Sequence, residues 1–444
     1  MEVKGILHLY HHPLVKNAST IREHIFSFEQ YSRFKVWSIN TELGFPSLLK
    51  DLDFRIIVLH YSLFAPNYYR LDDVFMDYLE HKQGSFKIAF FQDEYHACQK
   101  RFAFIDYLGI NVIYTLLESP YAEEVYGRHT RAGEIFSVLP GYVSDDLVRM
   151  ARRWSRPRAS RRIDIGYRGR VLPYYMGREA REKAFIGQEF KRRAAGSGFK
   201  LDIEVDEKKR IYGQAWYRFL ADCRAILGVE AGVSVFDLQD EVKAFYERVI
   251  RQRPNLSFRE WEDLAGKLLE RWEGKIFYRT ISPRHFEAAA FRIVQVLFEG
   301  RYSGILEPYR HYIPLKKDFS NFDEVMAMLQ DEAFCKELTE NAYEDLIASG
   351  RYSYRRFVES FDQMLIGHGF SPKISRETVV TVSRRLGKGK LRRWVKAYVL
   401  FTNFRYRKAL AVVLFPFRKP IQGLLKRFGI RSFTRQDFSW EKYE

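Results

Sequence analysis

TISPRHFEAAAFRIVQVLFEGRYSGILEPYRHYIPLKKDFSN, residues 280–321, is the segment from which the fold is best inferred. Ser282 and Pro283 end a loop, and an apolar helix follows with Glu287 near its start. The first turn of a helix offers free backbone N–H groups and the positive end of the helix dipole, which suit a phosphate. Arg284 and His285 lie at the same end, and the Glu287 carboxylate could accept hydrogen bonds from ligand hydroxyls. The alternative is an ordinary helix start with an acidic residue favoured by the dipole.

Upstream of this segment, short apolar runs alternate with helical patterns. We predict strands over 162–169, 199–205 and 223–230, a helix over about 178–195, and a helical, charged insertion over about 237–273. Downstream, we predict a helix over 284–299, a short strand over 304–308 and helices to about 366. Strands separated by helices indicate a parallel sheet covered on both faces. A second α/β domain over 160–366 is therefore expected.

The N-terminal third has the same alternation. The predicted strands are 4–10, 34–40, 54–62, 86–92, 111–117 and 135–140. They define a first α/β domain over 1–150, and the basic, irregular stretch 151–162 is predicted to be the linker between the domains. The expected architecture is α/β, with two doubly wound, Rossmann-like domains in tandem. Ligands are expected in the cleft at the carboxyl ends of the strands.

Two loops after strands of the second domain carry candidate ligand contacts. IGYRGRVLPYYMG (165–177) places Gly166 and Gly169 where the backbone can approach a diphosphate closely, with Arg168 and Arg170 beside them. The alternative is that both arginines are solvated loop residues. Glu230, in CRAILGVEAGVSVFD (223–237), follows a buried strand and would line the same cleft, unless it is an ordinary turn residue.

The RHFEAAA motif (284–290), with the FSNFDEV segment (319–325) after it, resembles the C-terminal domain of GT-B fold glycosyltransferases of the family-1-like, spore-maturation type. The resemblance implies that Glu287 binds the ribose of a nucleotide-sugar donor. It also implies that Arg168 or Arg170, together with Lys183, binds the donor diphosphate without a metal ion. The sequence departs from the E-x7-E motif of retaining transferases, since Arg279 replaces its first glutamate.

Polar residues follow several predicted strands of the N-terminal domain. They are His11, His60, Asp93, Glu94 and Glu118. In a GT-B enzyme this domain would hold the acceptor. We expect Asp93 or Glu94 to deprotonate an acceptor hydroxyl if the enzyme inverts the anomeric centre. His11 or His60 could instead donate a hydrogen bond to a phosphate. For each of them the alternative is a capping or structural role.

Several other classes of site find no support. The three cysteines, Cys98, Cys223 and Cys335, are too widely spaced for a CxxC metal site or a disulfide framework. There is no Walker loop, no G-x-S-x-G elbow and no pattern of metal-ligand spacing. No run of about 18 uncharged apolar residues is present, which excludes a spanning helix of the usual kind. We therefore expect no metal and no cofactor beyond the nucleotide sugar.

The C-terminal tail, 378–436, is strongly basic. It contains no acidic residue and has sixteen basic ones between residues 384 and 435, which account for almost all of the net charge of +17. Leu391, Trp394, Val395 and Tyr398 recur at helical spacing beside basic residues. Such a segment can lie in the interface of an anionic membrane. The alternatives are docking on the protein itself or binding of nucleic acid, which the long aliphatic run 409–415 disfavours.

Together these features predict a glycosyltransferase acting on a saccharide or lipid-linked acceptor at the cytoplasmic face of a membrane, in bacterial surface-glycan synthesis. Two alternatives remain open. One is a nucleotide-sugar epimerase or hydrolase on the same architecture, because a fold does not determine a function. The other is a non-catalytic membrane scaffold that binds a nucleotide sugar, which the arginine at position 279 leaves possible.

Overall fold

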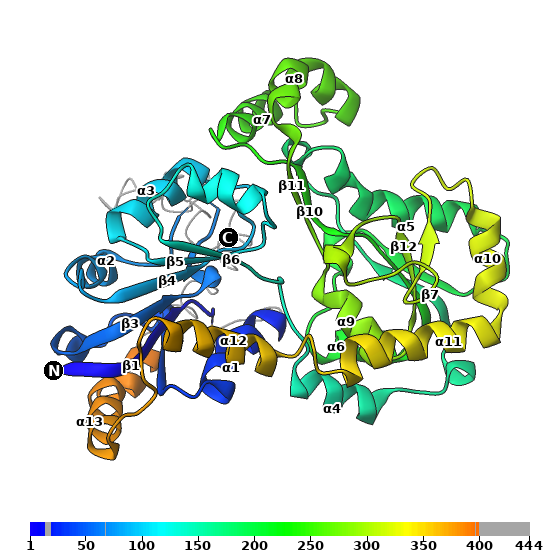
Figure 1. Cartoon of the computed structure of the whole chain (residues 1–444). Helices are drawn as coiled ribbons and strands as arrows, with labels where there is room; N and C mark the ends of the chain where they lie inside the picture. Colours follow the sequence, from blue (N-terminus) through cyan, green and yellow to red (C-terminus); the bar gives the residue numbers. More distant parts are fainter. Residues whose placement is uncertain (14–18, 67, 396, 399–444) are drawn as a thin grey trace, which may run out of the picture.

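The computed structural model describes residues 1–13, 19–66, 68–395 and 397–398. Its first unit is a six-stranded parallel sheet in the order β2-β1-β3-β4-β5-β6 (Figure 1). The strands are β1 (Glu2–Tyr10), β2 (Val36–Asn40), β3 (Asp53–Leu59), β4 (Phe86–Phe90), β5 (Val112–Thr115) and β6 (Glu134–Ser137). The helices between them are α1 (Ser19–Tyr31), α2 (Asp73–Glu80) and α3 (Cys98–Leu108).

The second unit is a five-stranded parallel sheet in the order β13-β12-β9-β7-β8. Its strands are β7 (Ile163–Arg168), β8 (Leu201–Glu204), β9 (Cys223–Gly228), β12 (Val294–Phe298) and β13 (Ile313–Leu315). Its helices are α5 (Glu182–Arg193), α6 (Gln214–Asp222), α9 (Pro283–Ala290), α10 (Phe322–Gln330) and α11 (Glu332–Tyr343). The predicted fold class, two Rossmann-like domains as in GT-B proteins, is confirmed.

Both faces of the N-terminal sheet are buried, and side chains alternate between them. Along β3, Ile57 and Leu59 belong to one hydrophobic cluster, whereas Ile56 and Val58 belong to another. This alternation follows from the two-residue period of a strand. Covering both faces explains why these strands read as nearly continuous apolar runs in the sequence.

The chain returns to the first domain after the second sheet is complete. Helix α12 (Tyr354–Gly367) lies beside α1 and packs Phe357 and Phe361 against the N-terminal sheet (Figure 1). It falls inside the range 160–366 that we expected to form the C-terminal domain. Helix α13 (Arg376–Gly387) follows, and Trp37 donates a hydrogen bond to Ser383 Oγ at 3.0 Å.

The insertion predicted over 237–273 forms a helical pair on a two-stranded arm. The antiparallel strands β10 (Ala231–Val235) and β11 (Glu273–Thr280) lead to α7 (Glu241–Gln252) and α8 (Phe258–Trp272). These helices project at the top of Figure 1 and enclose their own small core around Trp261, which is completely buried. Ser257 and Glu260 form a capping box at the start of α8.

Two predicted elements downstream were wrong. The helix expected over 284–299 ends at Ala290, and the next five-residue apolar run is strand β12. Arg292 adopts a φ of 49°, which turns the chain between them without a glycine or a proline. The segment 304–308, expected to be a strand, is irregular, and the strand that pairs with β12 is β13.

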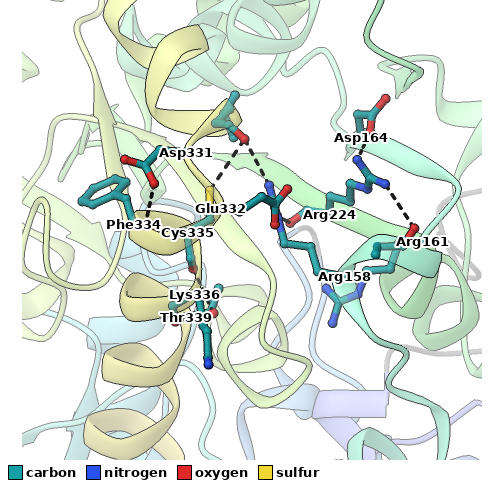
Figure 2. A network of polar contacts seen from close by, with 12 residues as sticks. Arg158, Arg161, Asp164, Arg224, Asp331, Glu332, Phe334, Cys335, Lys336 and Thr339 are labelled. Atoms are coloured by element: carbon teal, nitrogen blue, oxygen red, sulfur yellow. Dashed lines mark hydrogen bonds and ion pairs between the residues drawn. The ribbon is translucent and has the colours of Figure 1, made fainter.

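The basic linker is used structurally. It begins within the last turn of helix α4 (Asp145–Trp154), and beyond this helix Arg158 donates to Glu332 at 3.0 Å and to the backbone oxygen of Arg224 at 2.8 Å (Figure 2). Arg161 is buried and donates to the backbone carbonyls of Cys223, Phe291 and Arg292 at 2.9–3.0 Å. The arginines of this stretch therefore fasten the linker to the second domain.

Only the beginning of the predicted C-terminal tail lies within the described residues. Leu391, Trp394, Val395 and Tyr398 are exposed there, and the rings of Trp394 and Tyr398 stack at 5.2 Å. The rest of the tail, from 399 on, lies outside the described residues. Among the residues that are described, no helix combines the length and apolar character needed to cross a membrane.

Candidate functional site

The candidate site lies between the two domains, where residues after β4 meet the start of α5 and the arm strand β11. Asp93 follows β4 and is electrostatically coupled to Lys183 in the first turn of α5. One residue further on, Glu94 shares hydrogen bonds with Tyr278 of β11. These contacts bring the carboxyl end of the first sheet to the second domain, where the fold is expected to bind its ligand.

Three cationic side chains gather on the second domain's side of this site. They are Arg170, Lys183 and Arg284. Lys183 is half-buried, and within the described part of the chain no carboxylate forms an ion pair with its ammonium group. Burial, Arg170 and then Arg284 and Arg279 lower the pKa of Lys183 to about 8, against the opposing effect of Asp93. Like charges held together in this way create a site suited to an anion.

Arg284 is positioned by contacts on both sides of its guanidinium group. It donates to the backbone oxygen of Arg168 at 2.6 Å and lies over the Trp216 ring, 4.9 Å from the centroid. Ser282 caps helix α9 by accepting a hydrogen bond from the Arg284 N–H at 3.4 Å, and Pro283 occupies the first turn. The predicted helix start is confirmed, and it places Arg284 beside the loop after β7.

The sequence could not decide which of two arginines, Arg168 or Arg170, would bind a diphosphate. The structure gives the two side chains different surroundings. Arg168 is buried, pairs with Asp202 at 2.8 Å and lies over the Phe219 ring. Arg170 is exposed, and of the two it is the one that acts on Lys183. Of these two arginines, Arg170 is therefore the one whose side chain is free to contact a diphosphate.

The two glycines of the loop after β7 have different functions. A Cβ atom at Gly169 would lie 2.4 Å from the backbone oxygen of Lys183, so glycine lets the end of β7 approach the first turn of α5. A Cβ atom at Gly166 would instead meet the Cys223 sulfur at 2.4 Å, inside the core. Of the predicted pair, Gly169 is the glycine that shapes the site.

Glu287 is buried beneath the cationic cluster. Trp216 Nε1 donates to one of its carboxylate oxygens at 2.7 Å, and Tyr217 contributes a further side-chain hydrogen bond. Burial raises the pKa of Glu287 to about 7, although these hydrogen bonds and Arg284 oppose the shift. A carboxylate held in this way has acceptor capacity for the hydroxyls of a ligand.

Arg279 is the centre of a cluster of ion pairs that includes Glu230. Arg279 is buried and contacts Glu179 at 2.9 Å, Glu182 at 2.6 Å and Glu230 at 3.0 Å. Glu230 also accepts from the backbone N–H groups of Arg301 and Tyr302. The arginine that replaces the expected glutamate therefore ties β11 to the second domain, and the Glu230 carboxylate is fully engaged.

Asp93 is the exposed carboxylate on the side of the first domain. Its backbone has a φ of 54°, a left-handed conformation that few residues other than glycine adopt. Tyr95 donates to its carboxylate at 3.4 Å. Unusual backbone geometry at the end of a parallel strand is often found at functional sites. The carboxylate of Asp93 acts electrostatically on Lys183 and is exposed.

Glu94, its neighbour, is completely buried. It accepts hydrogen bonds from Thr115 at 2.6 Å, from the Leu116 N–H at 2.8 Å, and from the hydroxyls of Tyr126 and Tyr278. All of its acceptor positions are in use, which leaves Asp93 as the carboxylate of this pair that can reach a substrate.

The predicted histidines lie inside the protein. His60 is completely buried, where it contacts Ser62 at 2.8 Å and His24 at 3.0 Å. His11 is buried against Arg70 and Thr41, and burial, Arg70 and His12 lower its pKa to about 3. Both rings are therefore neutral near pH 7.

His285 and Glu118, which we also predicted to lie at the site, have different surroundings. His285 is buried and contacts Gln295 at 2.9 Å, and burial lowers its pKa to about 4. Glu118 lies 3.8 Å from Arg301 and so pairs the two domains across the cleft. Within the described part of the chain, no group of three or more His, Cys, Asp or Glu residues could hold a metal ion.

Two residues of the site were missed. Trp216, on α6, supports both Arg284 and Glu287. Glu23, on α1 of the first domain, is close enough to Glu287 for that carboxylate to raise its pKa. Neither belongs to a recognisable motif: Glu23 occurs in IREHIF (21–26), which reads as part of an amphipathic helix, and no signal in the sequence could have identified it.

No protein-family model and no curated protein matches the chain. Solved structures with a similar fold include an alpha-glucosyltransferase in complex with UDP-glucose and DNA containing an abasic site, with 11% identity, a TM-score of 0.46 and 82% of this chain and 99% of that chain covered. Anabaena HepE in complex with UDP and glucose has 10% identity, a TM-score of 0.45 and coverage of 81% and 98%. Sucrose-phosphate synthase from Thermosynechococcus elongatus has 9% identity, a TM-score of 0.44 and coverage of 82% and 98%. At these identities, the roles of individual residues rest on the geometry of this chain.

Proposed function

We propose that this chain is a glycosyltransferase that moves a sugar from a nucleoside diphosphate sugar to a hydroxyl of a saccharide or lipid-linked acceptor. The observation that carries the proposal is the cluster of Arg170, Lys183 and Arg284, with Asp93 of the other domain close enough to act electrostatically on Lys183. Cations on one side suit a diphosphate, and an accessible carboxylate on the other suits a hydroxyl that must lose its proton.

Each group has a defined task in the transfer. The acceptor oxygen attacks the anomeric carbon while the bond between that carbon and the diphosphate oxygen breaks. The bonding electrons leave with the diphosphate, whose growing negative charge Arg170, Lys183 and Arg284 stabilise. The acceptor proton passes to Asp93 as general base. Glu287 holds the ribose of the nucleotide through its hydroxyls.

Nucleotide binding is the first test. Thermal unfolding of the full chain is followed with UDP, GDP, ADP, dTDP and CMP, for wild type, Lys183→Met and Glu287→Ala. A ligand at ~100 Kd adds ~2.7 kcal/mol of stability, enough for a clear shift in Tm. One nucleotide should stabilise the wild type and should stabilise both variants less. Lys208→Met, at an exposed lysine of the same domain, is the matched control and should behave as wild type.

Turnover then separates the reaction classes. A transferase consumes the selected nucleotide sugar faster when an acceptor is present. A hydrolase or epimerase turns it over at the same rate without one, and a non-catalytic scaffold binds it without turnover. Failure of every nucleotide to stabilise the wild type would contradict the proposed donor site.

We further propose that the C-terminal tail holds the enzyme at an anionic membrane surface. Leu391 is 76% exposed, and Trp394, Val395 and Tyr398 are 45–47% exposed, at the start of a segment rich in Arg and Lys. Exposed aromatic and aliphatic side chains beside basic ones are typical of helices that lie in the lipid interface. This location would suit a lipid-linked acceptor and an enzyme of surface-glycan synthesis.

A further inference from the structure

The first turn of α1 lies against the second domain. Ser19 Oγ is 2.9 Å from the Tyr217 hydroxyl, and Tyr354 donates to the backbone oxygen of Thr20 at 3.3 Å. Glu23 is four residues after Ser19, so its side chain lies on the same face of the helix, one turn further along. The helix therefore directs Glu23 toward the residues that surround Tyr217.

Tyr217 connects this face to Glu287. It contributes a side-chain hydrogen bond to Glu287, and its neighbour Trp216 donates to the same carboxylate. Glu23 is in turn held by a side-chain hydrogen bond with Ser144, the cap of α4. Two carboxylates, one from each domain, thus approach each other at the side of the cationic cluster.

Cations act on each member of the pair, Arg22 on Glu23 and Arg284 on Glu287, but the effect of burial outweighs both. Burial and then Glu287 raise the pKa of Glu23 to about 7, and burial raises the pKa of Glu287 to about 7. Several charged or titratable groups act on the pair or are acted on by it: Arg22 on α1, Tyr61 after β3, Asp146 on α4, Tyr217 on α6, Arg284 on α9 and Tyr354 on α12. The pKa of each of the two carboxyl groups therefore lies close to neutral pH.

We propose that Glu23 binds the nucleotide together with Glu287, each carboxylate accepting a hydrogen bond from one of the two neighbouring hydroxyls of the ribose. A vicinal diol offers two O–H donors a short distance apart, which matches two neighbouring carboxylates. This inference rests on the proposed donor site and extends it, because the first domain would then recognise the nucleotide as well as the acceptor.

Protons and hydroxyls compete for the same carboxylate oxygens. Hydroxyl donors favour the ionised carboxylates, so binding of the nucleotide should release protons near pH 7. Affinity should accordingly fall as the pH is lowered from about 7.5 to 5.5. Both effects should be larger for the nucleotide than for an analogue without the two hydroxyls, because the titration of the diphosphate and of Lys183 is common to both.

The experiment compares two probes by calorimetry on the full chain: the nucleoside diphosphate selected by the thermal panel, and its 2′,3′-dideoxy analogue. In wild type, loss of the hydroxyls should weaken binding by about 10- to 100-fold, as hydrogen bonds to charged groups predict. In Glu23→Gln, the ratio of the Kd values of the two probes should shrink at least threefold. Glu29→Gln, an exposed glutamate on the same helix, should retain the wild-type difference.

Proton release is measured in parallel, from the dependence of the binding enthalpy on the ionisation enthalpy of the buffer. Release should be present with wild type and Glu29→Gln and should fall clearly with Glu23→Gln. Equal discrimination and equal proton release in wild type and Glu23→Gln would overturn the role of Glu23 while leaving the donor site intact. Absence of binding by wild type would overturn both proposals.

Discussion

The hydroxyl of Tyr278 on β11 lies 3.3 Å from a carboxylate oxygen of Glu94, and the backbone N–H of Glu94 donates to the same hydroxyl at 3.3 Å. This reciprocal contact fastens the arm of the second domain to the end of β4. It also fixes the backbone immediately after Asp93, the accessible carboxylate of the candidate site. A buried structural carboxylate thus positions its exposed neighbour.

Two substitutions test how much this contact contributes to the stability of the protein. Tyr278→Phe removes both hydrogen bonds of the hydroxyl with Glu94 and should lower the free energy of unfolding by ~1–3 kcal/mol. Glu94→Ala leaves the donors on Thr115, Leu116 and Tyr126 without their acceptor and should cost ~2–4 kcal/mol. Urea unfolding measures both. Tyr107→Phe, at a 57% exposed tyrosine, is the control and should change stability little; equal effects of Tyr278→Phe and Tyr107→Phe would contradict a stabilising contact.

Asp93 should be needed for turnover and dispensable for folding. Asp93→Asn keeps the size of the side chain and tolerates the left-handed backbone, since asparagine is enriched there. It removes the general base, for which a loss of ~10²–10⁴ in kcat is expected. Nucleotide binding should stay within about threefold of wild type, because the cations lie on the other domain. Unchanged kcat would exclude Asp93 as the base.

The lowered pKa of Lys183 predicts how the affinity for the nucleotide depends on pH. Its folded-state pKa is lowered from 10.5 to about 8 by burial and by Arg170. A bound diphosphate favours the charged ammonium, so affinity should fall as the pH rises above 8. Lys183→Met should bind ~10- to 100-fold more weakly at pH 7 and should lose this alkaline decrease. The Kd measured from pH 7 to 9.5 checks this, and Lys208→Met should keep the wild-type profile.

The raised pKa of Glu287 predicts that the contribution of this residue to the free energy of unfolding depends on pH. Its pKa is raised from 4.5 to about 7 by burial, so the folded state binds more protons than the unfolded state between these values. The stability contributed by this group is therefore present at low pH and is lost as the pH rises toward and above 7. Glu287→Gln removes the buried charge and should stabilise the protein by ~1–3 kcal/mol at pH 8, and much less at pH 5. An equal effect at both pH values would mean that the carboxylate is not titrating near 7.

Most strands of the two sheets could be predicted because apolar runs bounded by helical patterns are a local signal. Strand β12 could not, since AAAFRIVQVLF (288–298) reads as one helical stretch and the turn at Arg292 carries no glycine or proline. Similarly, spacing alone could not distinguish Arg168 from Arg170, because the choice depends on Asp202 in another strand. Glu23 reaches the site only through the packing of two domains, which no local pattern encodes.

The basic composition of the C-terminal tail predicts that the protein binds anionic lipid. Vesicles of phosphatidylglycerol and phosphatidylcholine should capture the full chain in flotation, because each basic residue near an anionic surface contributes ~1 kcal/mol. A chain ending at residue 389 keeps α13, whose Val382 is buried and whose Ser383 contacts Trp37, and should remain folded but lose membrane binding.

A double substitution separates lipid insertion from charge. Leu391→Glu with Trp394→Glu removes two exposed apolar side chains from the start of the tail and should weaken flotation by at least tenfold. Arg376→Gln with Arg385→Gln lowers the charge of α13 by the same two units and should weaken flotation less, because no apolar surface is lost. Full retention of binding by the chain ending at 389 would contradict the membrane role of the tail. Binding to vesicles of phosphatidylcholine alone, unaffected by either pair, would place the contact elsewhere on the protein.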